Sequence, residues 1–390
     1  YVPGHRLSPN VAGGLTALLL PTALELVGSV DRARGRGKRR TGLLLTVWGA
    51  VGACAMALAL LLSSSRGAWL GVGGALGLAG VWWLTGRLSR DARRGLTFSA
   101  LLSAGLLVAG VGLAGIPSLR SAILRNEALT NRLSIFYQAT HLVRDYPFTG
   151  CGLGNFPLVH STYVLLIHVP EMVFAHSTPL DVAVEQGMFG TMSLVAVWFG
   201  AAWRGAVQLL RWDEPPVGLA AGLLSLVVLM LHGTVDSTIY GSRAILLFWV
   251  PAGLIVVASM RRRGEAEQEA TGVAGSSQPP SEARPSRPER LSQTSTPGPL
   301  GRGYRWALGA AVLLIAASLA LLWRPMVASW FANLGSVHQT LVELGVYHHR
   351  DRADLTLDQV RQREDLSQAV AHFEHAVSLD PGQVTARTRL

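Results

Sequence analysis

The sequence predicts an all-α integral membrane protein: a polytopic helical bundle with one long outer loop and a small helical repeat tail. Of its 390 residues, 49% are hydrophobic and only 15% are charged, which is too apolar for a soluble protein of this length. Apolar runs of about 20 residues, the length that crosses a bilayer core, recur along the chain. The basic residues gather in the short segments between these runs, as is typical of cytoplasmic loops.

Eight apolar segments are predicted to span the membrane. They are residues 11–30, 41–62, 67–84, 96–115, 187–203, 217–231, 244–260 and 304–323. The first is less apolar than the others because it carries Pro21 and Glu25. Residues 1–260 are therefore expected to form the membrane body, and residues 304–323 a separate transmembrane helix.

The basic residues predict the orientation. Residues 31–40 and 85–95 are rich in arginine, and Arg204, Arg211 and residues 261–263 fall on the same side when the spans are counted. The net charge of +10 therefore indicates a lipid bilayer as partner rather than nucleic acid. We expect a multi-pass protein of the bacterial cytoplasmic membrane. Its outer segments would be residues 63–66, 116–186, 232–243 and everything after residue 324.

Two further features of the chain concern its cysteines and its ends. Cys54 lies in a predicted span and Cys151 in the long outer loop, so the sequence offers no disulfide framework or cysteine metal site. Because the chain starts with Tyr1 rather than Met and stops abruptly at Leu390, we expect a fragment of a longer protein.

Residues 261–303 are rich in Arg, Glu, Ser, Pro and Gly and hold almost no large apolar residue, which predicts a disordered cytoplasmic linker. The tail of residues 324–390 has helical periodicity. Its predicted apolar faces are Leu334, Val337, Leu341 and Leu344 on one helix, and Leu366, Val370, Phe373 and Val377 on another.

The tail resembles the tetratricopeptide repeat in its last helix. The residues that carry this resemblance are Ala369, Phe373, Ala376 and Pro381. The first-helix signature is poorly met, since Leu357 stands at its glycine position. A repeat would imply a binding surface for a protein partner or the acceptor, whereas a generic amphipathic hairpin is the alternative.

The outer loop, residues 116–186, is expected to hold the functional site, because connections of this length are uncommon unless they are structured or used. With neighbouring segments, it carries an ordered set of motifs. They are Pro9–Asn10, Ser65–Arg66–Gly67, Arg132, then Pro147, Gly150, Gly152, Gly154, Asn155 and Phe156, then Ala175–His176, and finally Glu185, Gly187 and Gly190.

In this order and membrane placement, the motifs resemble the O-antigen ligase family, over roughly residues 1–260. That family includes lipopolysaccharide ligases, O-antigen polymerases and some protein O-glycosyltransferases. The resemblance implies an inverting glycosyltransferase without metal or cofactor. Such an enzyme moves a glycan from a polyprenyl-diphosphate carrier to a glycan, lipid or protein acceptor outside the cytoplasm.

Arginine suits the leaving diphosphate, because its guanidinium group binds phosphate oxygens bidentately and keeps its charge. Arg66 lies on an outer turn and Arg132 in the outer loop, so both are candidates for binding the donor. Arg66 could instead snorkel to the membrane interface. Arg132 could instead form a loop salt bridge with Glu127 or Asp145.

Histidine suits the base that accepts the acceptor's proton, since its pKa lies near neutrality. The resemblance selects His176, although His141, His160 and His168 share the loop and an ordinary buried histidine is the alternative. Ser177 stands where the family usually has asparagine, which could tune acceptor choice or weaken activity.

Other polar groups are candidates for lesser roles. Asp181 and Glu185, four residues apart on one helical face, could contact the acceptor or lie on a solvated face. His232 and Asp236, near the end of a span, could line the same cavity but are not selected. The loop glycines are expected to permit tight turns, and no metal site is expected.

Two rival functions remain open. A transporter of lipid-linked glycans would use the arginines and His176 to line a polar pathway. A noncatalytic membrane scaffold that carries a repeat domain would need none of them for chemistry.

Overall fold

The computed structural model describes residues 9–28, 39–85, 127–167, 172–211, 218–237, 239–240, 244–260, 302–346 and 355–390. Every regular element in these stretches is a helix, which confirms the all-α fold class. The predicted span 96–115 and nearly all of the predicted linker 261–303 lie outside the described residues.

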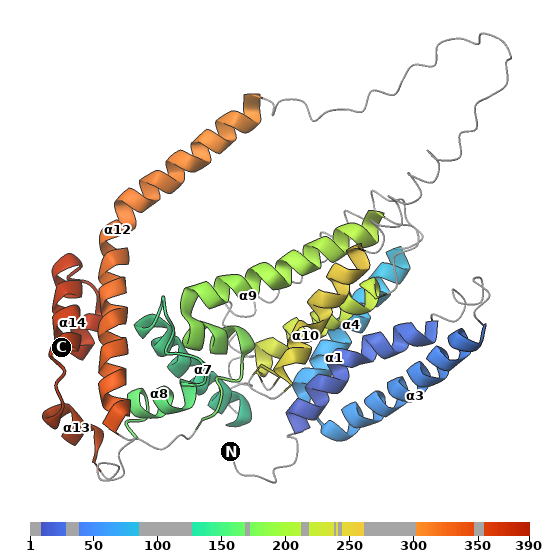
Figure 1. Cartoon of the computed structure of the whole chain (residues 1–390), viewed down its shortest axis with the longest axis horizontal. Coiled ribbons are helices and arrows are strands. Elements are labelled where there is room, and N and C mark those ends of the chain that lie inside the picture. Colours follow the sequence, from blue (N-terminus) through green and yellow to red (C-terminus); the bar gives the residue numbers. More distant parts are fainter. Residues whose placement is uncertain are drawn as a thin grey trace. The chain divides into compact units, whose positions relative to one another are not determined.

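Contacts divide the chain into two units, the first made of residues 1–264 with 340–364 and the second of residues 265–339 with 365–390. Four apolar helices form the centre of the first unit (Figure 1). They are α1 (Pro9–Gly28), α3 (Arg39–Ser63), α4 (Arg66–Thr85) and α10 (Leu219–Val235). Helix α1 packs against the other three, and α10 packs against α4 and against α9 (Thr178–Arg211).

The core of this unit consists of aliphatic and small side chains. One buried cluster joins α1, α3, α4 and α10, and it contains Ala17, Leu60, Ala68, Val72, Ala75 and Val228. A second cluster joins α1, α9 and α10 to the 3₁₀ helix η1 (Ile245–Trp249) and the helical residues that follow it. The small residues let helices approach closely, as is common between helices in membranes.

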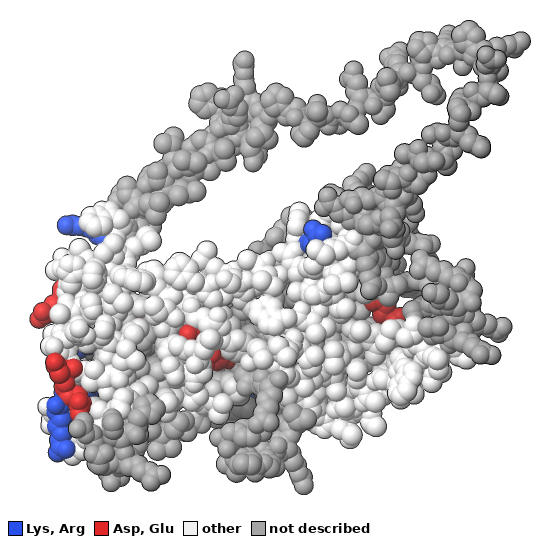
Figure 2. All heavy atoms as spheres, in the orientation of Figure 1, with Lys and Arg blue, Asp and Glu red and all other residues white. Residues whose placement is uncertain are grey.

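The membrane character of the bundle is clear from the described helices. By length and composition, three of them could cross a bilayer: Pro9–Val27, Leu43–Ser63 and Thr178–Leu210. Large apolar side chains point outward, including Trp48 at 72% exposure, as expected for contact with lipid. Figure 2 shows that few charged side chains interrupt the described surface over these helices.

Glu25, which makes the first span less apolar, has a structural role. Its carboxylate accepts hydrogen bonds from the backbone N–H groups of Gly218 at 2.8 Å and Ala221 at 3.3 Å. These groups lie at the N-terminal end of α10, where a helix has unsatisfied donors and a positive dipole end. A carboxylate inside one apolar helix therefore caps another.

The described part of the predicted outer segment is largely helical. It contains α7 (Glu127–Asp145) and α8 (Phe156–Tyr163), both of which pack against α9. Helix α9 itself is kinked, because Gly187 has a non-helical backbone with φ 63° and ψ −160°. The predicted span 187–203 thus begins at this kink.

The tail is helical, and its predicted apolar faces are right in part: Phe373 is buried and Val377 packs against the same cluster, whereas Leu341 and Val370 are exposed. Helices α12 (Arg302–Gly345), α13 (Leu357–Arg363), α14 (Ser367–Leu379) and α15 (Val384–Arg389) form it. Leu341 is 65% exposed and Val370 39% exposed. The buried cluster holds Ala332, Ala369, Phe373, Ala376 and Ala386, because small side chains leave room for the Phe373 ring. This set includes the repeat-like positions of α14, while the repeat itself stays a prediction.

Candidate functional site

The candidate site is built around the C-terminal end of α10. Asp236 follows the helix in extended conformation and is only 2% exposed, and its N–H donates to the carbonyl oxygen of His232 at 2.9 Å. Arg132 of α7 donates from Nη1 to the carbonyl oxygen of Val235 and places Nη2 3.8 Å from Oδ2 of Asp236. A cation at this helix end meets the negative end of the helix dipole.

This arrangement leaves Arg132 available for a ligand. Its side chain is 35% exposed, so the guanidinium group is held on one side and open on another. The loop salt bridge that the sequence suggested with Asp145 is wrong, because the ion pair of Arg132 is with Asp236. The pairing links two segments about a hundred residues apart in the sequence.

His176 lies on a strained turn just before α9. Its φ of 56° is in the left-handed region, which is uncommon for a residue with a side chain. The turn is held from both sides, since Oδ1 of Asp181 accepts from the N–H of Ala175 at 2.7 Å and the N–H of Asp181 donates to the carbonyl oxygen of Ser177 at 2.8 Å. Asp181 therefore orients the segment that carries His176.

The electrostatics of His176 connect it to the Arg132–Asp236 pair. Burial lowers the pKa of His176 below its ordinary value, the Asp236 carboxylate partly offsets this effect, and the Arg132 guanidinium adds to it. The imidazole is thus neutral at pH 7. Its Nδ1 is buried and has no hydrogen-bond partner among the described residues. A neutral imidazole beside a carboxylate has the chemistry of a general base.

Arg66 is the first residue of α4 and is exposed. The Ser-Arg-Gly segment forms the predicted turn between two spans, since α3 ends at Ser63 and the Oγ of Ser65 accepts from the N–H of Ala68 at 3.4 Å. The next residue, Gly67, packs directly on the end of α10. Arg66 therefore starts its helix beside the segment that holds Arg132.

His232 lies in α10, one helical turn before Asp236, and packs between α1 and α4. It is 1% exposed, with Gly14 of α1 on one side and Gly67 of α4 on the other. A Cβ atom on Gly14 would lie 2.6 Å from its Nε2, and a Cβ atom on Gly67 would lie 2.9 Å from its Nδ1. The two glycines thus make room for an imidazole one helical turn from Asp236.

The glycine-rich segment docks on the kink of α9. The N–H groups of Cys151 and Gly152 donate to the carbonyl oxygens of Val184 at 2.8 Å and Glu185 at 3.1 Å, which the kink frees from helical hydrogen bonding. Positive φ at Gly150, as at Gly152 and Gly154, confirms the predicted tight turns. Two motifs recognised separately in the sequence therefore form one structure.

Glu185 lies at this junction, and Asp181 is only 2% exposed. The alternative that these two carboxylates lie on a solvated helix face is therefore wrong. Glu185 accepts hydrogen bonds from the N–H of Gly154 at 3.0 Å and the hydroxyl of Tyr240 at 3.3 Å. Tyr240 in turn accepts from Gln186 at 2.7 Å. Burial raises the pKa of Tyr240 to about 12, so it acts as a neutral hydrogen-bond donor.

The described residues give little support to a cysteine nucleophile or to a metal site. Burial raises the pKa of the Cys151 thiol to about 12, which leaves it protonated and poorly nucleophilic at neutral pH. Within the described residues, no three His, Cys, Asp or Glu side chains are grouped to hold a metal ion.

The structure thus brings Arg132 and His176 together and starts α4, with Arg66, beside them. The segment that carries His176 continues with Ser177, Asp181 and Glu185. Ser177 and Asp181 are buried. Sequence reasoning did not select Asp236, although it pairs with Arg132 and its charge acts on His176. The available signal was an ionisable residue at the end of an apolar run, one turn after a histidine.

Residues 51–195 match the family model described as O-Antigen ligase. The matched region contains the second half of α3, all of α4, α7 and α8, and the first half of α9, and with them Arg66, Arg132 and His176. It ends before the turn of Asp236. A search of curated proteins gave no match.

Proposed function

We propose that this protein is a membrane glycosyltransferase that moves a glycan from a polyprenyl-diphosphate carrier to an acceptor outside the cytoplasm. The match to the ligase model supports a ligase role of glycosyltransferase type. One observation supports the proposal further: Arg132 pairs with Asp236, and the charges of both act on His176, so that an anion-binding group and a neutral base lie in one region.

Arg132 and Arg66 would bind the diphosphate of the donor. The bond between the anomeric carbon and the diphosphate oxygen breaks in the reaction, and the oxygen keeps the electron pair. Guanidinium groups near that oxygen stabilise its growing charge, so the leaving group needs no metal ion. The exposure of both arginines is compatible with contact to a lipid headgroup.

His176 would accept the proton of the acceptor hydroxyl as its oxygen attacks the anomeric carbon from the opposite face, which inverts the sugar. The imidazolium ion that forms would be stabilised by Asp236. Ser177, Asp181 and Glu185 follow on the same segment and are proposed to contact or orient the acceptor. The helical tail is proposed to bind a protein partner or the acceptor.

The test uses membranes of cells that make the full chain, with the lipid-linked glycans of those cells as donor. Release of free polyprenyl diphosphate is measured by mass spectrometry. His176→Ala should lower release by about 100-fold or more, as loss of a general base does. His141→Ala is the matched control, since His141 lies on α7 against Tyr137 and outside the site, and it should leave release near wild type.

Arg132→Ala should weaken donor binding, whereas Arg144→Ala, on the same helix and paired with Asp145, should not. If lipid-linked glycan crosses the membrane but no carrier diphosphate is released, the protein is a transporter. If His176→Ala leaves glycan assembly unchanged, the scaffold reading replaces the enzyme.

A further inference from the structure

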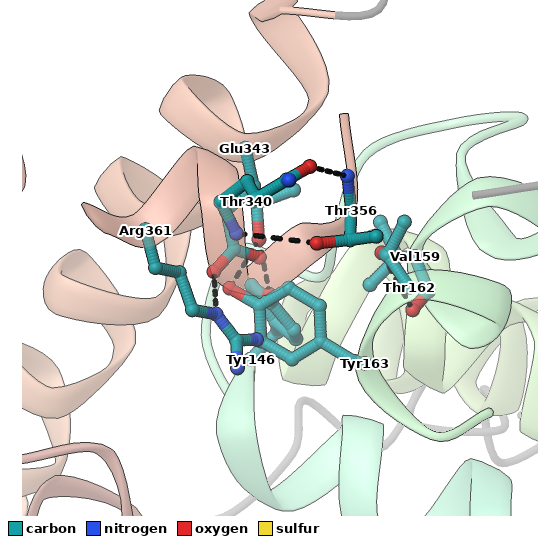
Figure 3. A network of polar contacts seen from close by, with 9 residues as sticks. Tyr146, Val159, Thr162, Tyr163, Thr340, Glu343, Thr356 and Arg361 are labelled. Atoms are coloured by element: carbon teal, nitrogen blue, oxygen red, sulfur yellow. Dashed lines mark hydrogen bonds and ion pairs between the residues drawn. The ribbon is translucent and has the colours of Figure 1, made fainter. Parts of the chain in front are cut away.

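We propose that Thr340, near the C-terminal end of α12, positions the glycine-rich turn of residues 147–154 for catalysis, through three connected buried hydroxyl groups. This inference rests on the proposed function. The hydroxyl of Thr340 lies between those of Tyr146 and Tyr163 and hydrogen-bonds to both, at 2.8 Å in the case of Tyr163 (Figure 3). All three side chains are buried.

The segment that carries Thr340 has its own fixed structure. Glu343, one turn further along α12, is fully buried and accepts from Nε of Arg361 of α13 at 2.7 Å (Figure 3). Helix α13 begins with a capping box, in which Thr356 and Gln359 exchange hydrogen bonds of 2.9 and 3.3 Å. The end of α12 is therefore held by an ion pair to α13, a helix with its own capped N-terminus.

Tyr146 connects this segment to the turn. Its carbonyl oxygen accepts from the N–H of Gly150 at 3.1 Å, and the carbonyl oxygen of the next residue, Pro147, accepts from the N–H of Met188 at 2.8 Å. The turn then binds the carbonyl groups of α9 just before its kink. One turn earlier on α9, Asp181 holds the Ala175–His176 segment. Hydrogen bonds, together with one turn of the α9 backbone, thus connect Thr340 to the segment that carries the proposed base.

Loss of the Thr340 hydroxyl would remove one hydrogen bond from each of two buried tyrosine hydroxyls, which favours displacement of Tyr146. Arg132 takes no part in this path, because it is held by Val235 and Asp236. The two functions of the site should therefore separate: orientation of the base depends on Thr340, and binding of the donor does not.

The experiment compares Thr340→Val, which removes the hydroxyl at nearly constant shape, with Thr340→Ser, which keeps it. Release of polyprenyl diphosphate is measured in membranes against the concentration of added lipid-linked glycan. Thr340→Val should lower kcat by about tenfold with KM within about twofold of wild type, and Thr340→Ser should restore most of kcat. Thr356→Val is the matched control, since it removes a hydroxyl from the same segment without touching the turn.

Hydrogen exchange of the purified full chain gives a second readout that needs no activity. Exchange in residues 147–155 should be faster in Thr340→Val and near wild type in Thr340→Ser. Unchanged exchange and kcat in Thr340→Val, or an equal loss of kcat in Thr356→Val, would overturn the inference. If wild type releases no carrier diphosphate, the proposed function fails, and the exchange data alone decide whether Thr340 positions the turn.

Discussion

Replacement of Gly187 by alanine tests the junction between the glycine-rich turn and α9. The backbone there, with φ 63° and ψ −160°, is nearly confined to glycine, so a side chain adds about 1–3 kcal/mol of strain. The new Cβ would lie 2.3 Å from the carbonyl oxygen of Phe148 and 2.7 Å from the nitrogen of Gly150. These are backbone atoms, which cannot rotate away, so the turn must separate from the helix.

Separation removes hydrogen bonds as well. Two backbone hydrogen bonds of 2.8 Å would be lengthened or lost, from Met188 to Pro147 and from Cys151 to Val184. Each loss would lower the free energy of unfolding by about 1 kcal/mol. With the strain, the free energy of unfolding should fall by about 3–5 kcal/mol. Carrier release should fall with it, because the same turn adjoins the His176 segment.

The assay is thermal unfolding of the purified chain in detergent, followed by loss of the monodisperse peak on size exclusion. Gly200→Ala is the control, because Gly200 lies in the same helix and has open space around its Cα. It should be neutral or slightly stabilising, since alanine favours helix over glycine. A Gly187→Ala protein as stable as Gly200→Ala would refute the packing argument for the kink.

Four further predictions concern the site and the helices packed around it. Asp236→Asn should raise the donor KM by about tenfold, because Arg132 loses the carboxylate that orients it; an unchanged KM would argue against that role. The acid limb of kcat/KM should lie below pH 6.5, since burial lowers the pKa of His176, and should move lower still in Asp236→Asn; a limb above 6.5 would contradict this. Because burial lowers its pKa, His176 contributes stability above pH 6.5, and this contribution is lost as the pH falls towards the lowered pKa. His176→Gln should remove this pH dependence of the free energy of unfolding. Gly14→Ala should cost about 1–3 kcal/mol of stability by overpacking, and His232→Ala in the same chain should recover part of it.

Much of the bundle could be predicted from the sequence, because every helix that crosses the lipid needs an apolar run of about 20 residues. Apolar runs without central charges identified α1, α3, α4 and α10 to within a few residues, whereas the predicted span 304–323 covers only the first half of α12. The same reasoning missed α7 and α8, since their packing partner is α9 rather than lipid or water. It also identified the tail faces only in part, because four of the five positions in the buried cluster are alanines, which an apolar pattern of large residues does not reveal.

The site was predictable only in part. Arg132 and His176 could be named because they stand in motifs whose order resembles a known family. Asp236 could not be selected in the same way, since it joins them through a contact between α7 and the end of α10, a hundred residues further along the chain. Likewise, nothing in the pattern around Thr340 indicates two tyrosine partners almost two hundred residues earlier.

The two capped ends of α10 bear on how deep the chemistry takes place. At 17 residues the helix is only about 26 Å long, whereas a hydrocarbon core measures about 30 Å. Glu25 supplies an anion at its positive end and Arg132 a cation at its negative end, so both termini are satisfied by protein instead of by water. A short helix of this kind can end below the headgroup layer. Under the proposed function, a sugar acceptor would then have to enter the membrane to reach its donor.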